Sequence, residues 1–241
     1  MALFALAYLR TDRGEPIDLV DRPYLVDILR DGARRHVCVA SAQSGKTTAY
    51  FAKLMHRMYR RSTQVIYTFP TDNQVRQFSG NRAKRMLRAF PLPLQDVDNQ
   101  SAKRFVNGSA ILFRGTKAEN QALSDPADVL VHDELDRSVP EVVDMYTDRV
   151  LATQDPIRYV FSSPTVPGFG ISREWMESTQ NEWTWPCPSC HEDQVFAPMD
   201  LSTHWRDHVD PERGEACALV CVHCGKDIDH REAILSGRWV P

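Results

Sequence analysis

Long apolar runs are scarce in this chain of 241 residues. The longest, residues 2–9, falls far short of the roughly 20 residues that span a bilayer, and no basic segment precedes it. We therefore expect no membrane anchor and no secretory signal, and a soluble protein that works in the cytoplasm. Apolar residues still make up 42% of the chain, which is enough for a core and excludes a disordered or collagen-like protein.

The chain also lacks a surplus of one charge, because 29 Lys and Arg stand against 32 Asp and Glu. The distribution is nevertheless uneven: residues 53–88 carry nine basic residues and one acid, whereas residues 121–155 carry nine acids and two arginines. The basic segment fits contact with nucleic-acid phosphates, and it equally fits the solvated faces of two helices. The sequence leaves both interpretations open.

Apolar, β-rich runs alternate with helical patterns over the first 165 residues. Strands are expected at 36–40, 64–69, 128–131 and 157–161, and helices at 47–61, from Thr71 to about 90, and at 140–153. The pair Asn107-Gly108 between two further β-rich runs predicts a hairpin, because both residues tolerate positive φ. This order indicates an α/β fold with a mostly parallel sheet flanked by helices.

A phosphate-binding loop is predicted directly after the first strand. The run fits G-x-x-x-x-G-K-[ST] except that Ala40 replaces the first glycine, and it consists of Ser41, Ala42, Gln43, Ser44, Gly45, Lys46, Thr47 and Thr48. A glycine lets backbone amides wrap around phosphate, the lysine reaches the β- and γ-phosphates, and the threonine offers its hydroxyl to Mg²⁺. The alternative is an ordinary helix start, which the order strand, loop, helix disfavours.

Two adjacent carboxylates, Asp133 and Glu134, follow the strand expected at 128–131. In a phosphate-loop NTPase an Asp at this place holds Mg²⁺, and the next Glu can polarise the attacking water. Adjacent acids are common at strand ends, so the interpretation depends on the phosphate loop upstream. The preceding His132 is read as a packed strand residue. The next strand end carries Ser163 and Thr165, whose hydroxyls fit a γ-phosphate sensor and equally fit a turn or cap.

Two C-x-x-C pairs near the C-terminus predict a structural Zn²⁺ site. Cys187 and Cys190 are separated from Cys221 and Cys224 by 30 residues, and four thiolates at this spacing complete a tetrahedral shell. A disulfide framework is disfavoured because nothing indicates secretion, and a redox C-x-x-C is disfavoured because the motif occurs twice. Cys217 and His223 remain alternative ligands. Composition changes near 170–185, so we expect domains at 1–175 and 176–241.

Taken together these motifs resemble the large subunit of tailed-bacteriophage terminase, of the GpA-like type. The match includes the phosphate loop, Phe69-Pro70-Thr71-Asp72, Asn107-Gly108, Phe113-Arg114-Gly115-Thr116, Asp133-Glu134-Leu135-Asp136-Arg137, Ser162-Ser163-Pro164-Thr165 and both cysteine pairs. The motifs occur in the family's order over roughly residues 20–240. Each is only moderately specific, and their combination is highly specific.

The resemblance implies a RecA-like P-loop ATPase that moves double-stranded DNA into a procapsid, followed by a small zinc ribbon. It implies that Lys46 and Thr47 hold ATP, that Asp133 holds Mg²⁺, and that Glu134 is the catalytic carboxylate. It further implies that the segment from Ser163 to Thr165 couples hydrolysis to movement and that Tyr24 lies near the adenine, although Tyr24 also fits plain helix packing. The implied partners are duplex DNA, the terminase small subunit, the capsid portal and further copies of the chain, in the host cytoplasm.

Two departures from the family pattern stand out. Many terminases carry an arginine in the phosphate loop where this chain has Ala42, so Arg34, Arg35, Arg137 or an arginine of a neighbouring subunit must replace it. Family members are also longer and carry a C-terminal nuclease domain, so we expect no nuclease activity from this chain. Two other functions stay open: a helicase-like ATPase, and a non-catalytic assembly module that combines a nucleotide fold with a zinc ribbon.

Overall fold

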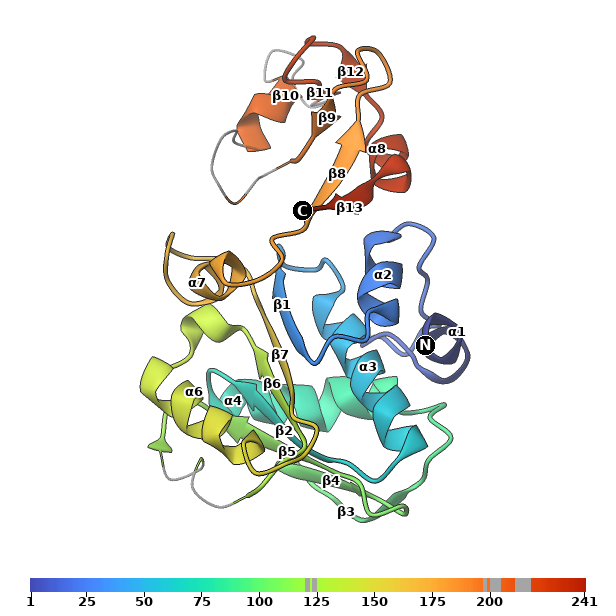
Figure 1. Ribbon diagram of the computed structural model, residues 1–241. Helices are drawn as coiled ribbons and strands as arrows, with labels where there is room; N and C mark the ends of the chain where they lie inside the picture. Colours follow the sequence, from blue (N-terminus) through green and yellow to red (C-terminus); the bar gives the residue numbers. More distant parts are fainter. Residues whose placement is uncertain (120–121, 123–124, 197–198, 200–204, 211–217) are drawn as a thin grey trace. The chain divides into compact units, whose positions relative to one another are not determined.

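The computed structural model describes residues 1–119, 122, 125–196, 199, 205–210 and 218–241 (Figure 1). These residues form two compact units. Unit 1 comprises Met1–Ile17 and Leu29–Ser178, and unit 2 comprises Asp18–Ile28 and Thr179–Pro241. Within the described part of the chain, no helix has both the length and the apolarity that a bilayer span requires.

Unit 1 is built on a seven-stranded sheet with the order β1-β7-β6-β2-β5-β4-β3. Five neighbouring strands are parallel: β1 (Arg35–Val39), β7 (Ile157–Ser162), β6 (Val129–Asp133), β2 (Gln64–Phe69) and β5 (Ala110–Gly115). Two antiparallel strands, β4 (Ala102–Phe105) and β3 (Leu94–Asp98), complete one edge. The expected mostly parallel α/β sheet is therefore confirmed.

The strand order places β7 between β1 and β6, whereas β7 is the last of the three along the chain. Parallel strands end at the same edge of a sheet, so the segments that follow β1, β7 and β6 meet there. These are the predicted phosphate loop, the Ser163–Thr165 turn and the acidic pair. The topology thus gathers three motifs that lie far apart in the sequence.

Helices cover both faces of this sheet (Figure 1). One face receives the long helix α3 (Lys46–Arg60), and the other receives α6 (Pro140–Thr147) and α7 (Ile171–Met176). Other helical segments include α1 (Ala2–Tyr8), α2 (Tyr24–Arg30), α4 (Asp72–Gln77), α5 (Lys84–Met86), and short 3₁₀ turns at Leu135–Arg137 (η3) and Asp148–Val150 (η4).

The two faces have different cores. Aromatic rings fill the α3 face: Tyr50 of α3 stacks on Phe161 of β7 with ring centroids 4.6 Å apart, and Tyr67 of β2 packs between Phe78 and Phe113. Aliphatic residues dominate the α6 face, where Ile66, Leu130, Val142 and Val150 form one buried cluster with Tyr146. Because successive strand residues point to opposite faces, residues of β2 and β6 divide alternately between these cores.

The helix expected from Thr71 to about residue 90 begins as predicted but is interrupted. Thr71 caps α4, because its hydroxyl accepts the Gln74 N–H at 3.2 Å. A π-helical segment, η1 (Phe78–Ala83), then replaces the regular turns, and α5 ends at Met86. The segment contains Ser79 and Gly80, which have modest helix propensity, while Phe78 stays anchored in the aromatic core.

The hairpin expected at Asn107-Gly108 connects β4 and β5, which pair antiparallel. Gly108 has a φ of 84°, whereas Asn107 keeps a negative φ and caps the loop by accepting the Ser109 N–H. The loop therefore has three residues, 106–108, with glycine at the left-handed position, and is not a two-residue turn in which both residues have positive φ.

Unit 2 contains two small three-stranded sheets. One has the order β13-β8-β9, from Arg238–Val240, Glu182–Pro186 and Asp193–Gln194, and the other has the order β10-β11-β12, from Val209–Asp210, Ala218–Val220 and Asp227–Ile228. The 3₁₀ turn η5 (Trp205–His208) and helix α8 (His230–Ser236) accompany them. Sheets this small bury little apolar surface and so contribute little folding free energy by themselves.

The aromatic core of the α3 face makes a testable contribution to stability. Phe113→Ala removes a ring that is 1% exposed, and we expect it to lower the free energy of unfolding by about 3–5 kcal/mol in a denaturant titration. Leu151→Ala, at a position 71% exposed, is the control and should change it by less than about 0.5 kcal/mol. Equal effects of the two substitutions would contradict this assignment of the core.

Candidate nucleotide-binding site

The loop between β1 and α3 has the backbone of an anion-binding turn. Gly45 caps α3 with φ 90° and ψ 3°, and Gln43 also lies in the left-handed region at φ 63°. Helix α3 starts at Lys46 and runs for 15 residues, so its first amides and its dipole face the loop. The Lys46 ammonium folds back over the loop and donates to the Ser41 carbonyl at 2.9 Å. A phosphate bound in the loop would take the place of the Ser41 carbonyl as the hydrogen-bond partner of the Lys46 ammonium.

The acidic strand end meets this loop directly. The Thr47 hydroxyl at the start of α3 donates to Asp133 Oδ2 at 3.0 Å, although the two residues are 86 positions apart. Leu130 of β6 packs with the α6 core, so alternation turns Asp133, three residues later, towards α3. The structure therefore brings together a threonine hydroxyl and a carboxylate, which are hard oxygen ligands suited to Mg²⁺.

Asp133 is buried, with only 3% of its surface exposed. Burial raises the pKa of Asp133 to about 7, while hydrogen bonds from Thr47 and Tyr67 and the charge of Lys46 act in the opposite direction. The Tyr67 hydroxyl donates at 3.1 Å from the aromatic core beneath the site. A buried carboxylate whose pKa is raised in this way is stabilised in its charged form by a nearby cation.

Glu134 lies next to Asp133 but has a different environment. Its backbone turns into the left-handed region, with φ 61° and ψ 47°, which ends β6 and directs the side chain away from the strand. Its carboxylate accepts a 2.7 Å hydrogen bond from the Gln74 side-chain amide. Gln74 is positioned in turn by Thr71, whose hydroxyl donates to Gln74 Oε1 at 2.9 Å.

Gln74 is a site residue that the sequence analysis missed. Its position in the sequence offered one clue, because α4 directly follows strand β2 (Gln64–Phe69). Since β2 pairs in parallel with β6, polar residues early in α4 lie at the edge where β6 ends. That pairing is a tertiary fact. Without it, Gln74 looks like an ordinary residue in the first turn of a helix.

The third segment at this edge lies between the other two. The Ser163 hydroxyl donates to the Ala40 carbonyl at 3.0 Å, and the Thr165 hydroxyl donates to Asp136 Oδ2 at 2.9 Å. Ser163 thus contacts the start of the phosphate loop, and Thr165 contacts the turn after Glu134. His132, by contrast, is fully buried beside Thr68, and burial lowers its pKa to about 3.

The candidate arginines lie at different ends of the sheet. Arg34 forms an ion pair with Asp155, and Arg35 forms one with Glu174, at the edge where β1 and β7 begin. Arg137 belongs to η3, directly after the acidic pair, and its side chain is exposed. Of the three, Arg137 alone lies at the edge where β6 ends.

The other predicted nucleotide contacts belong to two parts of the chain. Ser41, Ala42 and Ser44 belong to the turn before α3, and Thr48 belongs to the first turn of α3. Tyr24 belongs to unit 2, where its ring meets Trp183 edge to face at 5.8 Å and its carbonyl accepts the Trp239 indole N–H.

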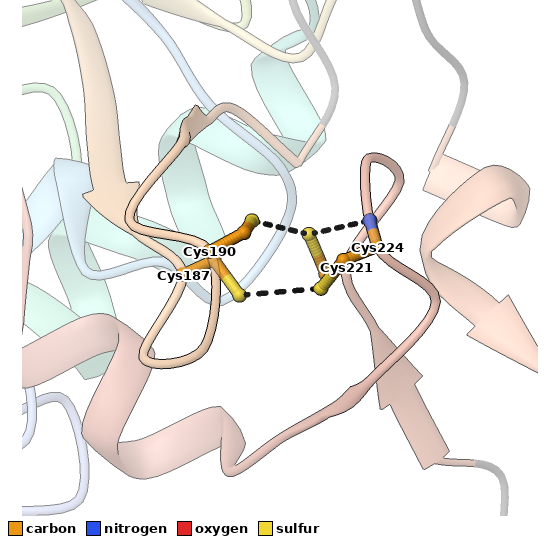
Figure 2. A group of neighbouring side chains, drawn as sticks. All are labelled: Cys187, Cys190, Cys221 and Cys224. Atoms are coloured by element: carbon orange, nitrogen blue, oxygen red, sulfur yellow. Dashed lines mark hydrogen bonds between the residues drawn. The ribbon is translucent and has the colours of Figure 1, made fainter.

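Unit 2 brings all four predicted cysteines together (Figure 2). Their Sγ atoms lie within 4.8 Å of one another, with Cys187 and Cys224 at 3.8 Å and Cys190 and Cys221 at 3.7 Å. Thiolates around a tetrahedral Zn²⁺ with Zn–S bonds near 2.3 Å are about 3.8 Å apart, so the cluster has the dimensions of a zinc site.

The two cysteine turns have the same local geometry. In each, the residue after the second cysteine has positive φ (His191 at 62° and Gly225 at 68°) and donates its N–H to the carbonyl of the first cysteine at 2.9 Å. Ser189 and His223 direct backbone N–H groups at the sulfur of the first cysteine, which favours the thiolate. Among the alternative ligands, Cys217 lies outside the described residues.

A comparison with protein families gives one match that spans most of the chain. The family described as "Phage terminase large subunit gpA, ATPase domain" matches residues 17–239. The chain belongs to this family. Membership implies ATPase activity, and the phosphate loop, the acidic strand end and the sheet described above are consistent with it.

Solved structures with the same fold are also large terminases. The ATPase domain of the Thermus phage P74-26 large terminase aligns with a TM-score of 0.55 and 18% identity over 77% of this chain and 79% of that one. The bacteriophage HK97 large terminase aligns with a TM-score of 0.58 and 14% identity over 73% of this chain. A large terminase from a thermophilic bacteriophage, solved with ADP, gives 0.54 and 15% over 66% of this chain.

This terminase ATPase domain corresponds to only part of the longer relatives. The alignment covers 39% of the HK97 terminase and 42% of the ADP-bound terminase. A comparison with curated proteins gives no match.

The buried carboxylate of Asp133 predicts a pH-dependent stability in Mg²⁺-free buffer. Since its pKa is raised to about 7 in the folded protein, this group lowers the stability as pH rises from about 4 to about 7. We expect Asp133→Asn to raise the free energy of unfolding by about 1–3 kcal/mol more at pH 8 than at pH 4.5. Thermal unfolding at both pH values measures this, and a gain of equal size at both would contradict it.

Proposed function

We propose that the chain hydrolyses ATP with Mg²⁺ at the edge where β1, β7 and β6 end, and that this hydrolysis drives double-stranded DNA into a procapsid. The observation that carries the proposal is the hydrogen bond between Thr47 and Asp133, because it joins the phosphate loop to the acidic strand end. Three further features support it: membership of the terminase ATPase family, the ADP complex of a relative, and the fold.

The residues of the site have separate roles in this proposal. The amides before α3 and the Lys46 ammonium hold the β- and γ-phosphates, and Lys46 exchanges its bond to the Ser41 carbonyl for the phosphate. Thr47 and Asp133 hold the Mg²⁺, which would neutralise charge on the phosphates. Ser41, Ala42, Gln43, Ser44 and Thr48 complete the cradle through their backbones or hydroxyls.

Glu134 is proposed as the catalytic carboxylate that orients the attacking water. Its hydrogen bond with Gln74 holds the carboxylate at one position, and moving that amide would release it. Arg137 is proposed to stabilise charge on the γ-phosphate, since it follows the acidic pair directly, and an arginine from a neighbouring copy is the alternative. Ser163 and Thr165 couple the site to movement.

Unit 2 is proposed as a zinc ribbon. The four sulfur atoms fit the metal in number, type and spacing, and among the described residues Cys187 and Cys221 lie in a small apolar cluster with Trp185, Ile228 and Ala233. Zn²⁺ would therefore supply folding free energy and take no part in the hydrolysis.

The proposed partners are duplex DNA, the terminase small subunit, the capsid portal and further copies of the chain, in the cytoplasm of the host. Two other functions make different predictions. A helicase-like ATPase separates the strands of a forked duplex, and a non-catalytic assembly module binds partners without turning over ATP.

Two substitutions separate binding from hydrolysis. Glu134→Gln keeps the hydrogen-bonding shape but loses the charge, and we expect it to bind ATP normally while its turnover falls about 10²–10⁴-fold. Lys46→Ala should lose nucleotide binding itself. Binding of a fluorescent ATP analogue and phosphate release, each with and without duplex DNA, are the measurements.

Glu141→Gln, on the exposed start of α6, is the matched control and should behave like the parent. Hydrolysis at the parental rate by Glu134→Gln would refute the catalytic role. Absence of DNA-stimulated turnover in the parent at high protein concentration would favour the assembly module, and strand separation would favour the helicase.

Zinc is tested by elemental analysis. We expect about one Zn²⁺ per chain, lost in Cys221→Ser and retained in Cys38→Ser, whose cysteine lies in unit 1. The metal-free protein should show loss of protection from hydrogen exchange in unit 2 alone. A metal-free protein with a fully protected unit 2 would refute the zinc ribbon.

A further inference from the structure

Asp136 is a buried carboxylate to which neither the fold nor the hydrolysis step assigns a role. It belongs to η3, two residues after Glu134, and is 8% exposed. Its Oδ2 accepts hydrogen bonds from the Thr165 N–H at 2.8 Å and the Thr165 hydroxyl at 2.9 Å, and its Oδ1 accepts the Ile171 N–H at 2.7 Å. A carboxylate that is buried away from water needs hydrogen-bond donors, and all three donors to Asp136 come from one segment.

The three bonds hold both ends of that segment, residues 165–171. Thr165 opens it and Ile171 begins α7, so one side chain closes the loop between them. The backbone is shaped for this contact. Gly170 has φ 53° and ψ −121°, and a Cβ there would lie 2.5 Å from Asp136 Oδ1, so only glycine lets the carboxylate come this close.

The same turn touches the other parts of the site. The Asp136 N–H donates to Ser162 Oγ at 3.3 Å, and the next residue, Ser163, donates to the carbonyl of Ala40 at the start of the phosphate loop. On the other side, Glu134 leads into η3 through the bond from the Arg137 N–H to the Glu134 carbonyl. Asp136 is therefore linked both to the Glu134 turn and to both ends of the segment.

We propose that Asp136 is a positioning residue that transmits the nucleotide state of the site to segment 165–171, through its hydrogen bonds to Thr165 and Ile171. The inference rests on the proposed function, since it assumes that ATP binds at the phosphate loop. Asp136 does not touch the reacting atoms. Through these hydrogen bonds, segment 165–171 moves together with the turn at Glu134, and the segment leads directly into α7.

Asp136→Asn tests the role with little change of volume. The amide that replaces the carboxylate keeps one acceptor but places an N–H₂ group against the donors of the segment, so it cannot accept all three bonds. We expect a fluorescent ATP analogue to bind within about 3-fold of the parent, and DNA-stimulated turnover to fall by about 10-fold, the scale of one allosteric coupling. Asp144→Asn, exposed on α6, is the matched control and should match the parent.

The decisive readout is hydrogen exchange of the peptide that contains 165–171, with and without the Mg²⁺-bound ATP analogue. In the parent, the analogue should change this exchange, and in Asp136→Asn the change should be absent although the analogue binds. A merely structural role would raise exchange equally in both states. Thr165→Val removes only the hydroxyl donor and should lose part of the response, which decides the question if Asp136→Asn does not fold.

The outcomes separate the two proposals. A parent that does not bind the analogue overturns the proposed function and the transmission role together. A parent that binds it, together with variants that keep the full exchange response and the full DNA stimulation, overturns the role of Asp136 alone.

Discussion

The hydrogen bond between Thr47 and Asp133 is the contact on which the site depends. It joins the first turn of α3 to the last residue of β6, and the parallel order β1-β7-β6 puts the ends of β1 and β6 at the same edge of the sheet. The bond also explains how a carboxylate can be buried there: Thr47 and Tyr67 donate to it, yet burial still raises its pKa to about 7. The threonine hydroxyl and the carboxylate at this contact are oxygen ligands of the kind that Mg²⁺ prefers.

Around this contact, each strand end carries out a different task. The loop after β1 presents amides and Lys46, and the turn after β6 presents Glu134. The turn after β7 joins the two, because Ser163 contacts Ala40 and Thr165 contacts Asp136. The aromatic core beneath β2 keeps Tyr67 in place and so supports Asp133 from below. The packing of one sheet face and the chemistry at its edge are thus parts of one arrangement.

Unit 2 is organised differently from unit 1, around its cysteine cluster. Its apolar cluster is small, and its two cysteine turns repeat one backbone geometry so that four sulfur atoms converge. The spacing of Cys187, Cys190, Cys221 and Cys224 sufficed to predict this convergence, because a C-x-x-C turn fixes two sulfur atoms locally and only one long-range pairing remains. Few other features of the chain depend so little on the rest of the fold.

The sequence by itself determined several local elements: the parallel strands of unit 1, the Thr71 cap, the hairpin at Gly108, the turn before α3 and the cysteine turns, since each follows from short-range periodicity or backbone preference. It did not determine the interrupted helix at Phe78–Ala83, where a buried ring overrides helical regularity. Nor did it reveal Gln74 or Asp136, because a polar side chain acquires its partner only when strand order and register bring distant segments to one edge.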